Sequence, residues 1–510
     1  MISKALKERP LFLILLVAAV LRITTAIFSE GYLMHDDHFW VVEAAASWSE
    51  GEDYNNWLPW SQEKLGLDPK PHYANIFYTS LHYYYFEITN WLGLTPFSKM
   101  GLLRILQGLF SLLAVMLSFK ITKNLAGTKP AVLVGFMVAC TAWIPLLSVH
   151  QMVEMSAIVP LLAFTWVLTK ESYSDLKNKD LIIAGVYLGI ATGLRYQVGV
   201  MGLGLVASFV LLEKGLTKSA ITNSLIAGTS ALIAFSATQL PTDLYLWGEP
   251  FAQLKAYIEY NLNNHNEYPG GTPLTYLFTI LVLAAPPLSL LFTYGYLKSI
   301  KKHALVVIPS LAFIVFHSVF PNRQERFILP ALPYIFIVGS IVYYELFHKN
   351  ILGKAILYIS FSLNFVILIP LTFFSKNTGQ MQAMEYIRQQ GDLESFLYVL
   401  SDGEAHPPRF YSDAWCRYTV ANQSTDVAAQ RITHCKDENT IVPNYLIFVG
   451  GAHIGELTNR FKDHYHSMEY ETRIKPGLFD IALNYFNPRI PLKEVMIYKI
   501  DPTLECSEIE

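Results

Sequence analysis

The chain has 510 residues, of which 52% are hydrophobic and only 15% are charged, and its formal net charge is −3. This composition excludes an ordinary soluble protein and indicates a membrane protein that crosses the bilayer many times. It also argues against nucleic acid as a partner, because the sequence has no sustained basic face to bind phosphate backbones.

The first apolar segment runs from Leu11 to Phe28 and follows Lys4, Lys7 and Arg9. It lacks a small-residue cleavage site and is long enough to span a bilayer of about 30 Å as a helix, so we predict a retained anchor. The positive-inside rule places the three basic residues in the cytoplasm. Loop 29–72 is then extracytoplasmic.

The next apolar segment, residues 75–93, contains His82, Glu87 and many tyrosines. Tyr and Trp prefer the membrane interface, so we predict a juxtamembrane helix on the outer surface here instead of a span. With this choice every inner loop is rich in lysine, whereas the opposite choice would put all these basic loops outside. We therefore expect about eleven transmembrane helices, at 11–28, 101–119, 131–149, 155–169, 180–195, 197–212, 219–240, 273–297, 304–320, 327–346 and 354–374.

After Phe374 the composition becomes that of a soluble domain. A helix pattern at 379–390 and strand patterns at 396–400, 445–449 and 495–500 predict a small α/β domain of ordinary size. The expected organisation is a helical transmembrane domain at 1–375, which includes the first extracytoplasmic loop at 29–98 with juxtamembrane helices, and an extracytoplasmic α/β domain at 376–510.

The four cysteines lack CxxC spacing, so neither a zinc site nor a redox motif is indicated. Cys416 and Cys435 can form a disulfide if their domain faces an oxidising compartment, and they can equally be free thiols.

The stretch Met34–Glu43 (MHDDHFWVVE) places Asp36, Asp37 and Glu43 just after the first apolar segment. Such acids can be solvated loop residues, helix caps, a cation site or a general base. Phe39, Trp40 and Glu43 follow at helical spacing, which indicates a short amphipathic helix that holds the acids near the membrane plane. A base at that position can act on a polar acceptor while the lipid tail of a donor stays in the bilayer.

Three arginines on the expected outer side are candidate phosphate ligands. Arg195 ends the apolar run 180–195, where an arginine can either extend to the interface or bind phosphate. Arg323 and Arg326 flank Glu325 in a short outer turn, where the positive-inside rule does not place arginines. A phosphate or pyrophosphate group is their natural counter-charge.

With these motifs in fixed order, the chain resembles the GT-C glycosyltransferases that use lipid-phosphate sugars. It looks most like glycosyltransferase family 22, the α-mannosyltransferases of GPI-anchor and N-glycan assembly. The family's HPDEHFQ followed by a glutamate is similar to residues 34–43, its RPT to residues 195–197, its FYGTHPWHWYFTQGLP to residues 268–279, and its HKExRFxxPxxP to residues 322–333. The family's histidines in these motifs are mostly not kept, so the sugar and the acceptor stay open. The acidic motif also suits relatives such as protein O-mannosyltransferases and lipid A aminoarabinose transferases.

The resemblance implies site residues. Asp36 and Asp37 are the expected catalytic residues, Asp36 as general base and Asp37 orienting it or binding the acceptor. Arg195, Arg323 and Arg326 are expected to hold the donor phosphate. The expected substrate-binding residues are His38, Glu43, Tyr196, Tyr268 and Glu325. No metal or other cofactor is expected, although a metal-dependent version that uses Asp36, Asp37, His150 and Glu154 stays open.

The expected function is therefore inverting transfer of a sugar, with mannose favoured, from a polyprenyl (dolichyl or undecaprenyl) phosphate donor to a glycolipid, glycan or protein acceptor. The expected location is a bacterial inner membrane, or the endoplasmic reticulum membrane if the source is eukaryotic, with the active site and C-terminal domain extracytoplasmic. The alternative is a multi-pass lipid or sugar transporter. Transporters place ionisable groups near the bilayer midplane, whereas here they gather at one face, which favours the enzyme.

Overall fold

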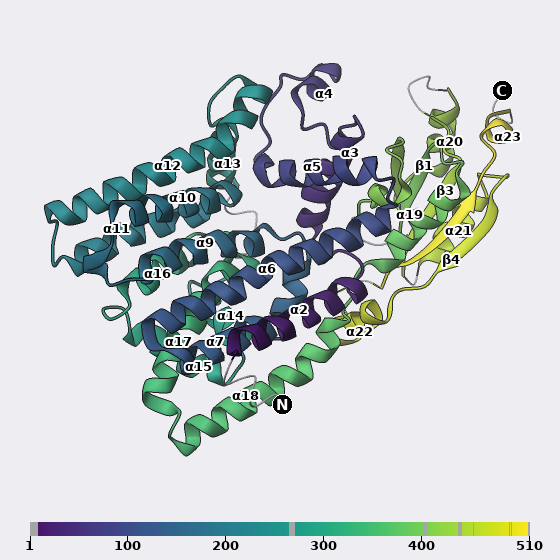
Figure 1. Cartoon of the computed structure of the whole chain (residues 1–510). Helices are drawn as coiled ribbons and strands as arrows, with labels where there is room; N and C mark the ends of the chain where they lie inside the picture. Colours follow the sequence, from purple (N-terminus) through teal and green to yellow (C-terminus); the bar gives the residue numbers. More distant parts are fainter. Residues whose placement is uncertain are drawn as a thin grey trace. The chain divides into compact units, whose positions relative to one another are not determined.

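A computed structural model describes residues 9–264, 271–401, 405–436, 441–451, 453–488, 490 and 492–507. Lys4, Lys7 and Tyr268 lie outside these ranges. The chain forms two compact units (Figure 1), which are described separately below. Unit 1 contains the residues up to Phe28, Asn55–Leu81 and Leu102–Phe373, and unit 2 contains Ser29–Tyr54, His82–Gly101 and the residues from Phe374 onward.

Unit 1 is helical. Its helices are α2 (Pro10–Phe28), α4 (Pro59–Lys64), most of α6 (Pro96–Ala126), α7 (Thr128–Cys140), α8 (Trp143–Val149), α9 (Val153–Thr169), α10 (Asn178–Leu194), α11 (Val200–Leu212), α12 (Lys218–Trp247), α13 (Ala252–Asn263), α14 (Thr275–Leu283), α15 (Leu288–Lys298), α16 (Ala304–Val319), α17 (Leu332–Val342) and α18 (Ile351–Thr372). Short 3₁₀ or π segments are η2 (Tyr173–Asp175), η3 (Tyr196–Gly199), η4 (Glu325–Ala331) and η5 (Tyr343–Phe347).

Five helical segments among the described residues are long and apolar enough to cross a membrane: α2, α6, α12, Glu325–Phe347 and α18. The pair α7 and α8, bent by 60°, makes a sixth candidate, and α9, Tyr196–Leu212 and α16 are shorter apolar helices. Each of the eleven segments expected from the sequence contains helix, but among the described residues only five or six qualify as candidate spans by length and composition. The count of eleven is therefore not confirmed.

Helices α10 and α12 pack unusually closely, and they run side by side in Figure 1. The reason is a stripe of glycines at intervals of four residues on α10, namely Gly185, Gly189 and Gly193. A Cβ atom on Gly189 would lie 2.3 Å from the Ala231 carbonyl oxygen on α12, and one on Gly185 would lie 2.3 Å from the Ala227 oxygen. Small residues at this spacing let two backbones approach, which is how helices commonly associate in lipid.

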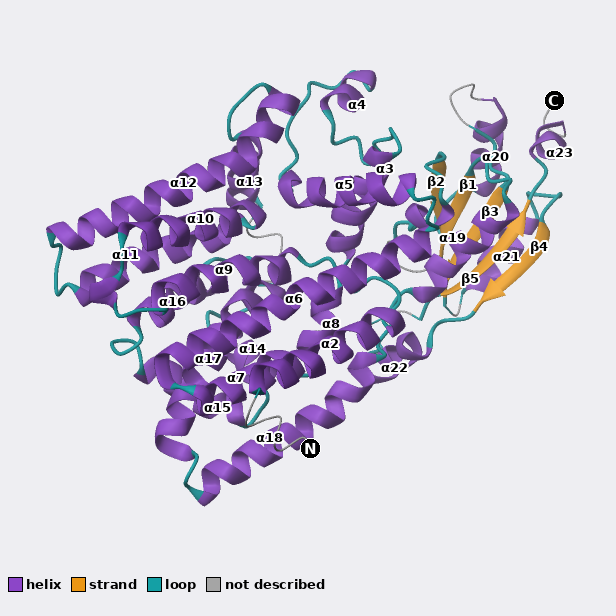
Figure 2. Cartoon of the chain, in the orientation of Figure 1, coloured by secondary structure: helices purple, strands orange, loops and turns teal. Residues whose placement is uncertain are grey.

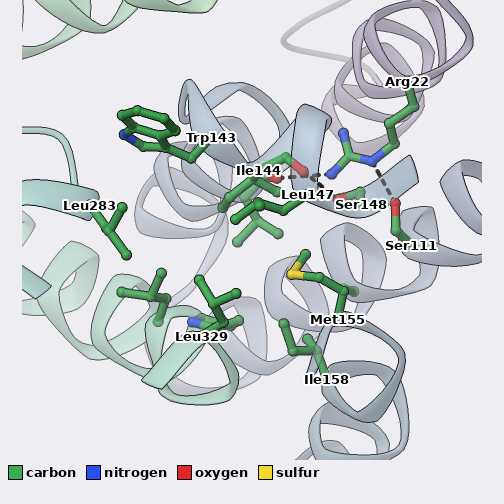
Figure 3. A pocket seen from close by; sticks show the side chains of 14 residues that line it. Arg22, Ser111, Trp143, Ile144, Leu147, Ser148, Met155, Ile158, Leu283 and Leu329 are labelled. Atoms are coloured by element: carbon green, nitrogen blue, oxygen red, sulfur yellow. Dashed lines mark hydrogen bonds between the residues drawn. The ribbon is translucent and has the colours of Figure 1, made fainter. Parts of the chain in front are cut away.

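The break between α7 and α8 is held by a buried arginine on α2 (Figure 3). The Arg22 side chain donates from Nη1 to the Ala139 oxygen (3.1 Å), from Nη2 to the Val138 oxygen (3.1 Å) and from Nε to Ser111 Oγ (2.6 Å). These carbonyls belong to the last turn of α7, where no intrahelical donor remains and a cation opposes the negative end of the helix dipole. Arg22 on α2 thus satisfies backbone carbonyl groups at the end of α7.

Unit 2 contains a five-stranded mixed sheet with strand order β2-β1-β3-β5-β4 (Figure 2). Its strands are β1 (Phe396–Leu400), β2 (Tyr418–Asn422), β3 (Tyr445–Gly450), β4 (Glu469–Ile474) and β5 (Glu494–Lys499). Its helical segments are η1 (Asp37–Glu43), α3 (Ala44–Ser49), most of α5 (Ile76–Trp91), α19 (Thr378–Gln390), η6 (Arg409–Ser412), α20 (Val427–Lys436), α21 (Ile454–Lys462), α22 (Leu478–Phe486) and α23 (Pro502–Ser507). The predicted helix 379–390 and the three predicted strands are confirmed.

One face of this sheet is covered by α20 and α21. Leu397 and Val399 of β1 and Leu446 and Phe448 of β3 form a core with side chains of these helices, such as Phe461. Alternate residues of a strand point to opposite faces. The central strands β1 and β3 are therefore buried on both sides, because their intervening residues are also buried.

The sequence left the pairing of Cys416 and Cys435 open, and the structure gives Cys435 a different partner. Cys435 on α20 is bonded to Cys506 on α23, with their Cα atoms 5.3 Å apart, and Cys416 is a free thiol. A buried ion pair between Arg431 on α20 and Glu505 on α23 (2.8 Å) brings the two helices together. The Cys416–Cys435 disulfide that the sequence allowed does not form, because Cys435 is bonded to Cys506.

The residues that follow the first apolar segment belong to the same compact unit as the C-terminal sheet. Gly31 forms a parallel bridge with Lys376, and the Lys376 amide donates to the Glu30 oxygen (3.2 Å). The Tyr32 hydroxyl donates to Gln380 on α19 (2.7 Å). Segments more than 340 residues apart in sequence are thus joined by backbone and side-chain hydrogen bonds.

The segment 75–93 forms helix α5, as predicted, and it is not among the described helices that qualify as membrane spans. Tyr84, Ile88 and Trp91 lie three or four residues apart and are all exposed. This exposed apolar stripe is typical of a helix that lies in the membrane interface.

Candidate functional site

Asp36 and Asp37 lie at the start of the π-helix η1 in unit 2. π-helical turns are rare and occur frequently at functional sites. The carboxyl of Asp36 is partly exposed and lies 3.7 Å from Nδ1 of His35. Asp37 is also partly exposed, whereas the following residues His38 and Phe39 are buried. The helix therefore leaves Asp36 and Asp37 partly exposed, and its buried residues are His38, Phe39, Val42 and Glu43.

The buried face of η1 is held by the C-terminal part of unit 2. Glu43 is fully buried and accepts a hydrogen bond from the Phe410 amide (3.2 Å), and its carboxylate lies 3.3 Å from His38 Nε2. The His38 ring is stacked on the rings of Tyr32 (4.6 Å) and Tyr411 (5.8 Å). His38 and Glu43, both predicted to bind substrate, thus contact other parts of the fold.

Arg409 makes a second connection between these segments. Its guanidinium lies over the rings of Tyr54, Trp415 and Tyr418. It donates to the backbone oxygens of Cys416 (3.1 Å) and Tyr54 (3.4 Å). Burial raises the pKa of the Cys416 thiol to about 11, and the nearby Arg409 charge opposes this shift. The Tyr54 hydroxyl in turn donates to the Phe39 oxygen of η1 (2.5 Å).

Arg195 lies in unit 1 at the end of α10, with 5% of its surface exposed. The glycine stripe fixes α10 against α12, and side-chain amides satisfy the last carbonyls of α10. Asn75 donates to the Gly193 oxygen (2.6 Å) and Gln239 donates to the same oxygen (3.2 Å). These contacts determine where the chain leaves the helix and hence where the Arg195 side chain begins.

The Arg195 guanidinium is paired with Glu154 in the first turn of α9, and it lies over the Phe327 ring (4.7 Å). Glu154 is only 2% exposed, and Nε of Arg326 is 3.7 Å from the same carboxylate oxygen. The structure thus brings together Arg195 and Arg326, which lie far apart in the sequence. Two guanidinium groups share one carboxylate, so this group carries a net positive charge.

Several polar atoms around this group lack partners. Nε and Nη2 of Arg195, the Tyr276 hydroxyl and Nε2 of His317 are buried and have no hydrogen-bond partner among the described residues. Arg195 lies close enough to both Tyr276 and His317 to act on them electrostatically. Buried donors without partners are costly, and a bound phosphate or an ordered water would satisfy them.

His317 can accept a hydrogen bond, whereas the Arg195 guanidinium can only donate. Its Nδ1 lies 2.9 Å from the Phe313 oxygen, which can only accept a hydrogen bond. Nδ1 therefore carries the proton, and in a neutral ring Nε2 is an acceptor. The cluster can therefore accept a hydrogen bond from a hydroxyl group as well as bind an anion.

The other predicted residues have more varied settings. Arg323 donates from Nε to the Ser318 oxygen (3.1 Å) and from Nη1 to the Gly271 oxygen, and so caps the end of α16. The Tyr196 hydroxyl donates to Gln239 (2.8 Å) between α10 and α12. Glu325 is exposed and acts electrostatically on Tyr276, and Tyr268 lies outside the described residues.

These contacts do not favour the alternative in which Asp36, Asp37, His150 and Glu154 bind a metal. Glu154 is occupied by guanidinium groups, and burial lowers the pKa of His150 to about 3, with Arg104 adding to this effect. Within the described ranges, no three His, Cys, Asp or Glu side chains gather as a metal cluster would require.

The sequence did not indicate three features: His317, Arg409 and the contact of the Phe327 ring with the Arg195 guanidinium. His317 ends an apolar helix, which gives it no distinguishing pattern. Arg409 lies outside the motifs that carry the family resemblance, and only the fold shows that it contacts Tyr54.

Comparison with known proteins identifies the family. The model of the Alg9-like mannosyltransferase family matches residues 13–399, which is most of the chain. The chain belongs to this family. A relative in Saccharomyces cerevisiae, "Dol-P-Man:Man(7)GlcNAc(2)-PP-Dol alpha-1,6-mannosyltransferase", is 25% identical over 206 residues, which are 38% of this chain and 37% of the yeast protein's length.

The fold resembles that of a solved GT-C enzyme. ArnT from Cupriavidus metallidurans in the apo state is 11% identical with a TM-score of 0.63, and the match covers 95% of this chain and 97% of that one. ArnT bound to undecaprenyl phosphate gives a TM-score of 0.59 with the same coverage. The chain is therefore a membrane protein of the Alg9-like family with a GT-C fold.

Proposed function

We propose that this member of the Alg9-like family transfers a sugar, with mannose favoured, from a polyprenyl phosphate to an extracytoplasmic glycolipid, glycan or protein acceptor with inversion. The family and the yeast relative, whose name specifies a dolichyl-phosphate mannose donor and a lipid-linked glycan acceptor, support the sugar and the donor class. The GT-C likeness supports the fold on which such chemistry occurs.

The observation that carries the proposal is the buried Arg195 with two nitrogens that have no partner among the described residues. Glu154 neutralises one of the two guanidinium charges, so Arg195 and Arg326 retain one positive charge for a phosphate. A guanidinium presents a fork of donors that matches phosphate oxygens and cannot lose its charge. In our proposal Arg195 and Arg326 bind the donor phosphate, Tyr276 adds a hydroxyl donor, and His317 Nε2 accepts a hydrogen bond from a hydroxyl of the bound substrate.

Asp36 is the proposed general base. It takes the proton of the acceptor hydroxyl as that oxygen attacks the anomeric carbon, and the bond between this carbon and the phosphate oxygen breaks. The polyprenyl phosphate leaves with an additional negative charge, which arginines stabilise. Attack on the face opposite the leaving group inverts the anomeric configuration. Asp37 orients Asp36 or binds the acceptor, and Glu325 and Tyr268 remain proposed substrate contacts.

The contacts of His38 and Glu43 support a positioning role for these residues. Both are buried against parts of unit 2, and they fix the π-helix that begins with Asp37. Substrate binding by either of them remains a prediction.

The experiment supplies the purified full-length protein with radiolabelled polyprenyl-phosphate mannose and a panel of glycolipid acceptors, and it identifies the labelled product. We expect transfer by the wild type and a loss of at least about 100-fold in Asp36→Asn, the range of general-base effects, with donor binding retained. Asp53→Asn is the matched control, because Asp53 lies in the same segment and accepts a hydrogen bond from Trp48 Nε1 (3.0 Å) that an asparagine oxygen can also accept. Wild-type turnover in Asp36→Asn would remove this residue as the base.

Sidedness is tested separately by cysteine accessibility in intact membranes. We expect single cysteines at positions 36 and 323 to react with an impermeant thiol reagent from the extracytoplasmic side, and one at position 301 to react from the cytoplasmic side. Opposite labelling of positions 36 and 323 would contradict the proposed topology.

A further inference from the structure

Helix α22 of unit 2 has one face packed and the other exposed. Phe479 and Asp480 point toward the protein: the Phe479 ring is 5.3 Å from the Phe374 ring, and Asp480 accepts a hydrogen bond from the Asn377 amide (3.2 Å). Burial raises the pKa of the Asp480 carboxyl, and its hydrogen bonds and the nearby Lys376 and Lys493 oppose this shift. The packed face therefore ties α22 to residues 374–377.

The opposite face of α22 is apolar. Leu478, Tyr485 and Phe486 are each at least 80% exposed, and Ile481 is 46% exposed. Leu478, Ile481 and Tyr485 follow the i, i+3, i+7 spacing that places side chains on one side of a helix. Four large apolar side chains on nine residues form a patch that a freely solvated helix does not maintain.

The place of α22 along the chain indicates what covers this patch. Its packing partner Phe374 is only two residues beyond Thr372, the last residue of the candidate span α18. Two residues of extended chain reach about 7 Å, so Phe374 must lie at the end of the span. A helix packed on Phe374 is consequently held at the boundary of the bilayer.

The charges near α22 fit the same location. Lys376 and Lys493 lie near its packed face, and the exposed Lys475 precedes it by three residues. Lysines beside an exposed apolar stripe are typical of helices that lie in the plane of the interface, where cations meet lipid headgroups.

We propose that α22 inserts its face of Leu478, Ile481, Tyr485 and Phe486 into the outer part of the bilayer and anchors the C-terminal α/β region to the membrane surface. The lipid bilayer is the occupant of this face. The inference is independent of the transfer reaction, because it depends only on the chain being a membrane protein.

The test places an environment-sensitive NBD fluorophore on α22 of the full-length protein in lipid nanodiscs. Tyr485→Cys and Leu478→Cys are labelled in a background in which the free thiols Cys140 and Cys416 are replaced by serine and the Cys435–Cys506 bond is kept. Glu456→Cys on α21, whose side chain is 85% exposed, is the matched control. Each labelled variant is compared only if it melts at the temperature of its unlabelled parent, and the two α22 positions serve as alternates for each other.

We expect blue-shifted emission at positions 478 and 485 and quenching by lipids with a doxyl group at carbon 5, with weaker quenching from carbon 12, because an interfacial helix reaches about 5–10 Å into the lipid. Position 456 should be quenched by aqueous iodide and not by doxyl lipids. Iodide quenching at 478 and 485 equal to that at 456 would overturn the proposal. Blue-shifted emission without doxyl quenching would also overturn it, because protein would then cover the face.

Discussion

The contact between Gly31 and Lys376 provides a sharp test of how the segment that carries Asp36 and Asp37 is held. Gly31 has a φ of +95° and pairs with Lys376 in a parallel bridge. A Cβ atom at this position would lie 1.7 Å from the Lys376 carbonyl oxygen. The substitution Gly31→Ala therefore adds a backbone conformation that alanine disfavours and a direct clash with the backbone.

The two costs can be separated. Alanine at positive φ costs about 1–2 kcal/mol by itself. Relieving the clash requires a shift of roughly 1.5 Å to reach normal contact distance, which breaks the Lys376–Glu30 hydrogen bond and strains the neighbouring bond from Ser29 Oγ to the Phe374 oxygen. Each such bond contributes about 1 kcal/mol, so Gly31→Ala should cost about 2 kcal/mol more than the conformational penalty alone.

Gly51→Ala is the matched control, since Gly51 is in the same unit and has a φ of +79°, and a Cβ atom added there would meet nothing within 4 Å. The assay is thermal unfolding of the purified full-length protein with limited proteolysis between residues 29 and 54. We expect a clearly lower melting temperature and faster cleavage for Gly31→Ala than for Gly51→Ala. Equal behaviour of the two variants would refute the reasoning that the bridge to Lys376 fixes this segment.

Three further changes test other parts of the fold. Gly189→Leu should destabilise the protein by about 2–3 kcal/mol and weaken donor binding, because the added Cβ would meet the Ala231 oxygen at 2.3 Å and displace the end of α10. The control is Gly228→Leu, where an added Cβ meets nothing within 4 Å. This control should be near neutral in thermal unfolding and donor titration. Glu43→Gln should reduce the free energy of unfolding by about 1–2 kcal/mol, since it weakens the hydrogen bond from the Phe410 amide. It should also lower turnover with donor affinity unchanged. Unaltered turnover and melting temperature would argue against a positioning role. Burial lowers the pKa of His72 to about 4, below its ordinary 6.5. Between pH 6.5 and 4 the unfolded chain therefore binds a proton at His72 that the folded chain does not bind. Stability should fall as the pH falls from 6.5 to 4. His72→Phe keeps the stacking on Trp57 (3.8 Å) and should reduce this pH dependence of the melting temperature, and an unchanged pH profile would contradict the assignment.

The sequence predicted those features that depend on local patterns. Apolar runs located the helices, and the buried strands β1, β3 and β5 had continuous hydrophobic patterns. The edge strands β2 and β4 were missed because an edge strand is partly exposed and its sequence, as in EYETRI, is mostly polar. The span count failed to be confirmed because several apolar segments form shorter or broken helices.

The candidate site was predictable in its residue types but not in its contacts. Outer-side arginines indicated phosphate binding, and the structure brings Arg195 and Arg326 to one carboxylate. The sequence could not indicate that Glu154 is that carboxylate, because the residues are joined only by the packing of α9, α10 and η4. Glu43 was expected to bind substrate, and only the fold shows that it is buried and accepts a hydrogen bond from the Phe410 amide, 367 residues away. Cysteine connectivity has the same limit, since it depends on α20 and α23 being neighbours.

The proposed roles of Asp36 and Arg195 are tested together by measuring turnover and donor affinity in the same preparations of wild type, Asp36→Asn and Arg195→Lys, with polyprenyl-phosphate mannose as donor. We expect Asp36→Asn to lose turnover with an unchanged donor Kd, and we expect Arg195→Lys to weaken donor binding, because an ammonium group cannot reproduce the guanidinium fork. Wild-type turnover in Asp36→Asn together with wild-type donor affinity in Arg195→Lys would rule out both roles.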